Sequence, residues 1–145
     1  MVSVDQLPSP HHLFRCPFAR EHKRCVAAVG ESSAGLAVAF DRFAAAVAPR
    51  TWQCDYHHAD WETATAAAIA ALDDAAPWAS SRALASVAAE IAGARGGDEM
   101  TMWMAHSLFA DPIFLMRSDL PALGNGQHRV CAMKIAGVMR CVIDS

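Results

Sequence analysis

The middle of the chain constrains the fold most, because it consists of alanine-rich segments with helical spacing that follow one another closely. Each segment ends at proline or glycine, and the segments are residues 35–49, 61–77, 82–97 and 99–112. Short polar side chains stand before the last three, where they can accept hydrogen bonds from the first backbone N–H groups: Asp60, Ser80 or Ser81, and Asp98. These helices are too apolar to be stable alone, so the sequence predicts a bundle of about four helices that packs on the rest of the chain.

The two ends of the chain have a different pattern. Val2 and Val4 alternate with polar residues before Pro8, which indicates a short strand and a turn. The remaining expected elements are a basic helix over 19–31, strand-like residues 112–123 with a turn at 118–119, a helix over 127–136 closed by Gly137, and a last strand over 140–144. This order predicts an α+β domain that carries an all-helical insertion.

Composition excludes several classes of protein. With 145 residues, 54% of them hydrophobic, the chain has the size and composition of one globular domain. It has no apolar run of the roughly 18–20 residues that a membrane span needs, and its N-terminus has no secretory signal pattern. The lack of such a run predicts no membrane partner. Its five cysteines are odd in number and form no CxxC pair, so we expect free thiols in a reducing cytoplasm.

Charge is distributed unevenly along the chain. The formal net charge of −3 argues against indiscriminate binding to nucleic acid. Residues 31–99 hold 10 of the 15 acidic side chains but only 4 of the 12 basic ones. If the two ends meet in space, they form a mildly basic surface that can attract an anionic ligand.

The stretch GNGQHR, residues 124–129, lies directly before the last predicted helix. The first N–H groups of a helix have no partner within the helix, and the helix dipole places partial positive charge there. Two glycines allow a tight turn, and His128 and Arg129 add donors in the first turn, which together predict an anion site. In the alternative interpretation the glycines only form a turn, Asn125 caps the helix and Arg129 pairs with a carboxylate.

A family resemblance bears on this choice. The segment LGNGQHRVCAMKIAGVMRCVI resembles the nucleotide-binding signature of the ParB/sulfiredoxin superfamily, and residues 2–29 are similar to the opening strand, turn, arginine and helix of that family. The resemblance implies a single domain over residues 1–145, with a ParB/sulfiredoxin-like core in 1–30 and 112–145 and a helical insertion in 31–111. It also implies a phosphate-binding set consisting of Asn125, Gly126, Gln127, His128, Arg129 and Arg15.

The chain departs from the family at informative points. Gln127 occupies the position of the catalytic cysteine of sulfiredoxins, so we do not expect peroxiredoxin repair. The sequence ends at Ser145, without the DNA-binding and dimerisation segments of partition proteins, so we do not expect a chromosome-partition clamp. Hydrolysis of a nucleoside triphosphate or phosphoryl transfer, with Mg²⁺, would need a carboxylate such as Asp5, and no catalytic residue is assigned.

Three functional hypotheses follow from these observations. The first is binding of a nucleotide or another phosphate-bearing ligand, with or without turnover. The second is a non-catalytic DNA-binding or regulatory protein of the same fold, which would use the basic side chains Arg15, Arg20, Lys23 and Arg24. The third is a protein-interaction module that uses the helical block.

Two further clusters have competing interpretations. Residues 54–62, CDYHHADWE, contain enough cysteine, histidine and carboxylate groups for a metal, but their spacing favours a polar loop and a helix cap, so no metal site is expected. The methionines of residues 100–104 and the four tryptophans of the helical block are expected mainly in the bundle core. A pocket for a base or a partner is the alternative for the tryptophans.

Overall fold

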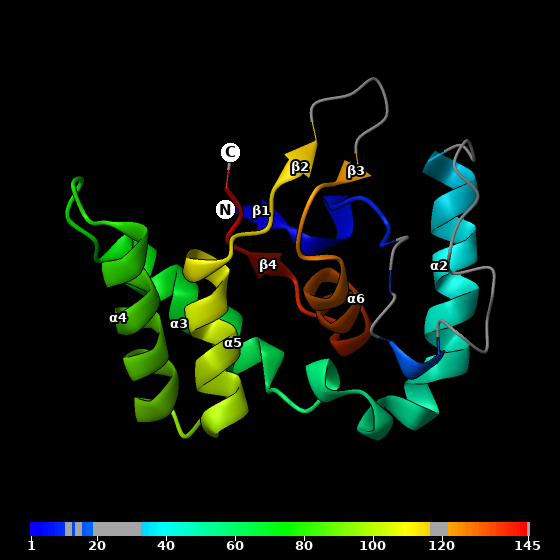
Figure 1. Cartoon of the computed structure of the whole chain (residues 1–145), viewed down its shortest axis with the longest axis horizontal. Coiled ribbons are helices and arrows are strands. Elements are labelled where there is room, and N and C mark those ends of the chain that lie inside the picture. Colours follow the sequence, from blue (N-terminus) through cyan, green and yellow to red (C-terminus); the bar gives the residue numbers. More distant parts are fainter. Residues whose placement is uncertain (11–12, 14–15, 19–32, 117–121, 145) are drawn as a thin grey trace.

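The computed structural model describes residues 1–10, 13, 16–18, 33–116 and 122–144, and within these ranges the chain combines helices with small antiparallel sheets. Helices α3, α4 and α5 pack together on one side, α2 stands on the opposite side, and α6 lies between them beside the strands (Figure 1). The α-helices are α2 (Ser33–Val47), α3 (Trp61–Asp73), α4 (Ser81–Ala94), α5 (Glu99–Ala110) and α6 (Gln127–Ala136). The α+β class expected from the sequence is therefore confirmed.

Local sequence signals explain where the helices begin. Asp60, Ser80 and Asp98 each accept a hydrogen bond from a backbone N–H of the first turn, at 3.0, 3.2 and 2.8 Å. The three predicted caps are confirmed, and Ser80 rather than Ser81 is the cap of α4. Helix α2 ends at Val47, before Pro49, and continues as a 3-10 segment η3 (Ala48–Gln53), followed by the short 3-10 turn η4 (Asp55–His57).

The strands are short and bring the two ends of the chain together. Strand β1 (Val2–Ser3) pairs antiparallel with β4 (Arg140–Cys141), and β2 (Leu115–Met116) pairs antiparallel with β3 (Ala122–Leu123). An isolated parallel bridge joins Phe114 to Asp144. Helix α3 contacts both β4 and α6, so the helical block packs on the terminal segments.

Buried apolar side chains form two clusters. The main cluster lies where α3, α4 and α5 meet α6 and the strands, and its alanines permit close helix contacts. The second cluster attaches α2 to the N-terminal arm and α6, and it contains Phe40, Phe43 and Val47. The two clusters bury the apolar side chains whose helical spacing the sequence shows.

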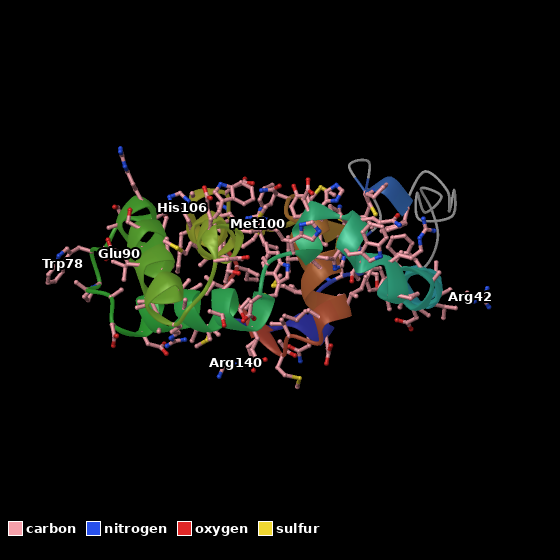
Figure 2. All side chains as sticks on the ribbon, turned by 90° about the horizontal axis from the view of Figure 1, so that it is seen from below. Arg42, Trp78, Glu90, Met100, His106 and Arg140 are labelled. Carbon is pink, nitrogen blue, oxygen red and sulfur yellow. The ribbon has the colours of Figure 1, made fainter. Side chains whose placement is uncertain are left out.

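The tryptophans correct one expectation. Trp61 is 2% exposed and belongs to the core, but Trp52, Trp78 and Trp103 are 70%, 85% and 55% exposed. Figure 2 shows Trp78 projecting from the end of the helical block, far from Arg42 at the opposite end of the molecule. Helical spacing alone does not tell which tryptophans face the interior, because the bundle has a solvent face as well. The methionine stripe is mixed, since Met104 is buried while Met100 and Met102 are half-buried.

Several expected features lie outside the described residues: the basic helix over 19–31, the turn at 118–119, and Arg15. Within the described ranges, no helix has the length and apolar character required to cross a membrane.

Candidate functional site

Helix α6 begins as the sequence predicts. Gly126 is its N-cap, with a φ of +82°, and the helix runs over Gln127–Ala136 to Gly137, which also has a positive φ. A Cβ atom on Gly126 would lie 2.6 Å from Cγ1 of Ile113, so this position needs glycine for space as well as for conformation. No side chain caps α6, which leaves its first turn to other partners.

Arg129 is built into the fold instead of facing an open site. Its side chain is 5% exposed, and its Nη1 donates to the backbone carbonyl of Ser107 at 2.7 Å. Its Nη2 pairs with Oδ2 of Asp111 at 3.2 Å. Burial lowers the pKa of Arg129, while the charge of Asp111 raises it. This is the pairing with a carboxylate that the alternative interpretation expects. The other part of that interpretation is wrong, because the N-cap of α6 is Gly126 and Asn125 does not cap the helix.

Asn125 and Gln127 also have partners within the chain. The Asn125 amide donates to Oδ1 of Asp111 at 2.7 Å and to the carbonyl of Pro112 at 3.0 Å. The Gln127 amide donates to the carbonyl of Leu123 at 2.9 Å. Asp111 therefore accepts a hydrogen bond from Asn125 on one carboxylate oxygen and from Arg129 on the other. These bonds join the end of α5 to the start of α6. We call this group the Asp111 clamp.

His128 occupies a different environment. Its ring stacks on the ring of Tyr56, with centroids 5.0 Å apart and an interplanar angle of 19°. The turn η4 holds Tyr56 in place, because the indole N–H of the buried Trp61 donates to the Tyr56 carbonyl at 2.6 Å. His128 thus contacts Tyr56, a residue that lines a cavity.

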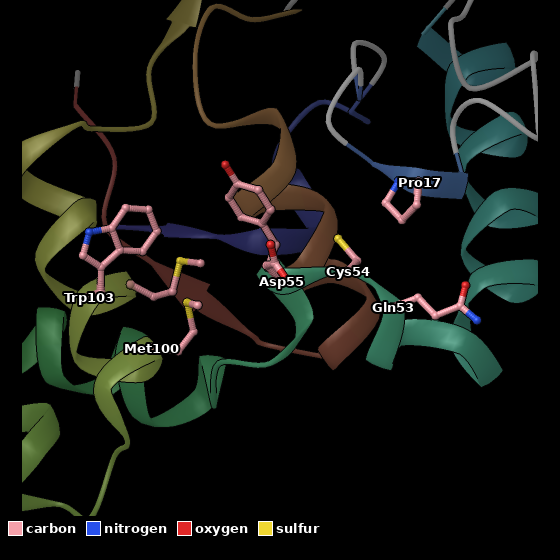
Figure 3. A pocket seen from close by; sticks show the side chains of 8 residues that line it. Pro17, Gln53, Cys54, Asp55, Met100 and Trp103 are labelled. Carbon is pink, nitrogen blue, oxygen red and sulfur yellow. The ribbon is translucent and has the colours of Figure 1, made fainter.

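The cavity next to Tyr56 has a volume of about 570 Å³, within the range of roughly 300–1,000 Å³ typical of small-molecule sites. Figure 3 shows Trp103 and Met100 of α5 on one side and Asp55, Cys54, Gln53 and Pro17 on the other. The full lining is Pro17, Gln53, Cys54, Asp55, Tyr56, Met100, Trp103 and Met104. Apolar walls with a few polar groups can hold a flat ring and orient it.

Residues 54–62 behave as a structured polar segment. Asp60 caps α3, His58 donates to the carbonyl of Trp52 at 2.7 Å, and burial lowers the pKa of His57. Among the described residues, no three His, Cys, Asp or Glu side chains are arranged to hold a metal ion.

Asp5 lies away from the start of α6. It lines a second cavity of about 510 Å³ together with Asp41 and Lys134, and Lys134 is in the last turn of α6. Lys134 Nζ donates to the Asp5 carbonyl at 3.5 Å. The structure therefore does not bring Asp5 together with Gly126 and His128.

Sequence reasoning missed Tyr56 as a site residue, and it gave a pocket only as the alternative for Trp103, which lines the cavity. Tyr56 is the only tyrosine of the chain and lies within the polar run 54–62, so its position was a usable signal. Trp103 was assigned to the core because methionines surround it at helical spacing.

Comparison with known proteins finds no match for this chain among protein-family models, curated proteins or solved structures. The resemblance to the ParB/sulfiredoxin superfamily therefore depends on the sequence motifs alone.

Proposed function

We propose that this chain binds a small molecule that has both a flat ring and a phosphate group, and that a nucleotide is the ligand class that fits best. The observation that carries the proposal is the stack of Tyr56 on His128, because Tyr56 also lines the cavity. The stack thereby links an apolar cavity to the first turn of a helix, where anions bind favourably.

The ring of the ligand would occupy the cavity. Trp103 is 55% exposed and offers an aromatic face beside Met100, and stacking of a base on such a face contributes about 1–3 kcal/mol. Asp55 and Gln53 supply polar groups that can accept hydrogen bonds from an amino group of the base or from sugar hydroxyls.

The phosphate would lie at the start of α6, in contact with Gly126, Gln127 and His128. The helix dipole and the backbone N–H groups of the first turn favour negative charge there. Asn125 and Arg129 act in this proposal as positioning residues, because their side chains are engaged in the Asp111 clamp. The role of Arg15 stays a prediction from the family resemblance.

Binding without turnover is the function that these residues support. A magnesium site needs oxygen ligands, and Asp55 is the carboxylate that lines the cavity in the described part of the chain. Mg²⁺ is usually held by one or two carboxylates together with substrate phosphates, so the ion would enter with the nucleotide, and hydrolysis or phosphoryl transfer stays a hypothesis. The ParB/sulfiredoxin-like fold is part of the same proposal and is supported by the motifs at residues 123–143.

A protein-interaction module is the second candidate, because one observation favours it. Trp52 and Trp78 are 70% and 85% exposed, which is unusual for side chains of this size. The DNA-binding hypothesis depends on four basic side chains that all lie outside the described residues, so no observation favours it.

Calorimetric titration with ATP, CTP, GTP and inorganic phosphate, each with and without Mg²⁺, tests the proposal. We expect Trp103→Ala to weaken nucleotide affinity about tenfold through loss of stacking. Trp78→Ala is the matched control, since Trp78 is an exposed tryptophan outside the cavity lining, and it should leave the affinity unchanged.

His128→Ala tests the phosphate end. We expect this variant to weaken binding of the nucleotide more than binding of the corresponding nucleoside. Equal affinities of the Trp103 and Trp78 variants would place the ring elsewhere. If no nucleotide binds to the folded protein, the proposal is refuted, and the protein-interaction module is then the candidate function that an observation supports.

A further inference from the structure

Three thiols meet in the second hydrophobic cluster, although their residues are far apart in the sequence. Cys16 comes from the N-terminal arm, Cys54 from the link between η3 and η4, and Cys131 from α6. Their residues are 3%, 5% and 3% exposed, and the described cysteines form no disulfide. Cys16, Cys54 and Cys131 thus pack in one buried cluster, and of the two neighbouring thiols Cys16 has the larger effect on the pKa of Cys54.

The cavity beside Tyr56 reaches one of these thiols. Cys54 is part of the cavity lining, and so is Pro17, which directly follows Cys16. In Figure 3 the side chain of Cys54 lies on the side of the cavity opposite Trp103. Cys54 is therefore the thiol of this cluster that borders the cavity, whereas Cys16 and Cys131 are not among the lining residues.

We propose that Cys16 and Cys54, which share one buried cluster beside the cavity, form an oxidation site at which a hydroperoxide converts the two thiols into a disulfide. With hydrogen peroxide, the Cys54 sulfur attacks one peroxide oxygen, the O–O bond breaks, and a sulfenic acid and one water form. The Cys16 sulfur then attacks the Cys54 sulfur, the S–O bond breaks, and a second water leaves. Two thiols are oxidised and one peroxide is reduced to two waters.

The electrostatic surroundings of Cys54 determine how fast this reaction is. The hydrogen bond with Cys16 raises the pKa of the Cys54 thiol most, burial and the nearby thiols raise it further, and the backbone N–H of Tyr56 lowers it. The thiolate is the nucleophile, so oxidation is slow at neutral pH and accelerates roughly tenfold per pH unit between pH 7 and 9. A sensor cysteine with a depressed pKa would show no such rise.

The disulfide would close a loop between positions 16 and 54. Such a link restricts the unfolded chain, and it would join the N-terminal arm to the cluster that holds α2. The oxidised protein should therefore melt at a higher temperature than the reduced protein. This inference stands on the thiol geometry and does not require that a nucleotide binds.

The test is oxidation of the native protein with hydrogen peroxide, followed by thiol titration under denaturing conditions and mass mapping of the peptides. We expect a Cys25→Ser background, which retains four thiols, to lose two of them and to yield a peptide pair joined through Cys16 and Cys54. Cys54→Ser in this background should abolish the loss.

Cys141→Ser is the matched control, because Cys141 is buried and burial raises the pKa of its thiol to about 11, but it lies outside the thiol cluster. This variant should still lose two thiols. A disulfide to Cys131 or between two chains would overturn the proposal, and so would an unchanged thiol count at pH 9. Peptide mapping of the unaltered chain gives the same decision if a variant does not fold.

Discussion

The Asp111 clamp gives a direct test of whether Arg129 supports the fold or contacts a ligand. Arg129→Ala removes the hydrogen bond to the Ser107 carbonyl, the pairing with Asp111 and the packing of the aliphatic stem. Hydrogen bonds of charged groups contribute about 1.5–3 kcal/mol, so with the lost packing we expect a loss of about 3 kcal/mol. Asp111→Ala should cost less, about 1–2 kcal/mol, because the Asp111 side chain is 70% exposed and water can partly replace it.

Thermal unfolding followed by circular dichroism at pH 7 measures both losses. For a chain of this size about 1 kcal/mol corresponds to roughly 3 °C in Tm, so we expect decreases of about 9 °C for Arg129→Ala and about 4 °C for Asp111→Ala. Arg82→Ala is the matched control, since Arg82 is an exposed arginine on α4, and its Tm should change by less than about 1 °C.

The double variant decides whether the two side chains act on each other. If they do, the loss in the double variant is smaller than the sum of the single losses by about 1 kcal/mol. An Arg129→Ala protein that melts close to the wild-type temperature but loses nucleotide affinity would refute this reasoning. Arg129 would then contact the phosphate itself, as the family resemblance implies.

Two further predictions concern the starts of helices. Gly126→Ala should lower the free energy of unfolding by about 2–4 kcal/mol, because alanine is strained at a φ of +82° and its Cβ would meet Ile113. Gly137→Ala has a similar φ but open space around it, so it should cost about 1 kcal/mol. Equal losses of the two variants in urea unfolding would show that the contact with Ile113 is unimportant. The hydrogen bond from the Thr63 backbone N–H lowers the pKa of Asp60, so the cap stabilises the fold above the unfolded pKa of about 3.9 and this contribution disappears as pH falls through the folded pKa. The stability difference between wild type and Asp60→Ala should therefore shrink in acid, and a constant difference from pH 7 to pH 2 would contradict this.

Features that depend on neighbouring residues were predictable from the sequence. The caps Asp60, Ser80 and Asp98 each act on the third residue after them, and Gly137 ends α6 through a conformation that glycine adopts without strain. The bounds of α6 follow from the same local rules, since a glycine stands at each end of the helix.

Features that depend on distant contacts were not predictable. Arg129 finds Asp111 eighteen positions earlier, and this pairing depends on how α5 is placed relative to α6. The helix dipole disfavours a cation in the first turn of a helix. When the position of Asp111 is not known, such a cation is therefore interpreted as a ligand-binding group. The exposure of Trp103 has the same origin, because the packing of the helices decides which face of α5 is covered.

Tyr56 connects the features that matter for function. Its carbonyl accepts from Trp61 in the main core, its ring stacks on His128 of α6, its side chain lines the cavity, and its backbone N–H interacts with Cys54. The turn that carries it has only three residues, so none of these contacts can shift far without moving the others. We therefore expect a ligand that displaces the Tyr56 ring to affect both Cys54 and the first turn of α6.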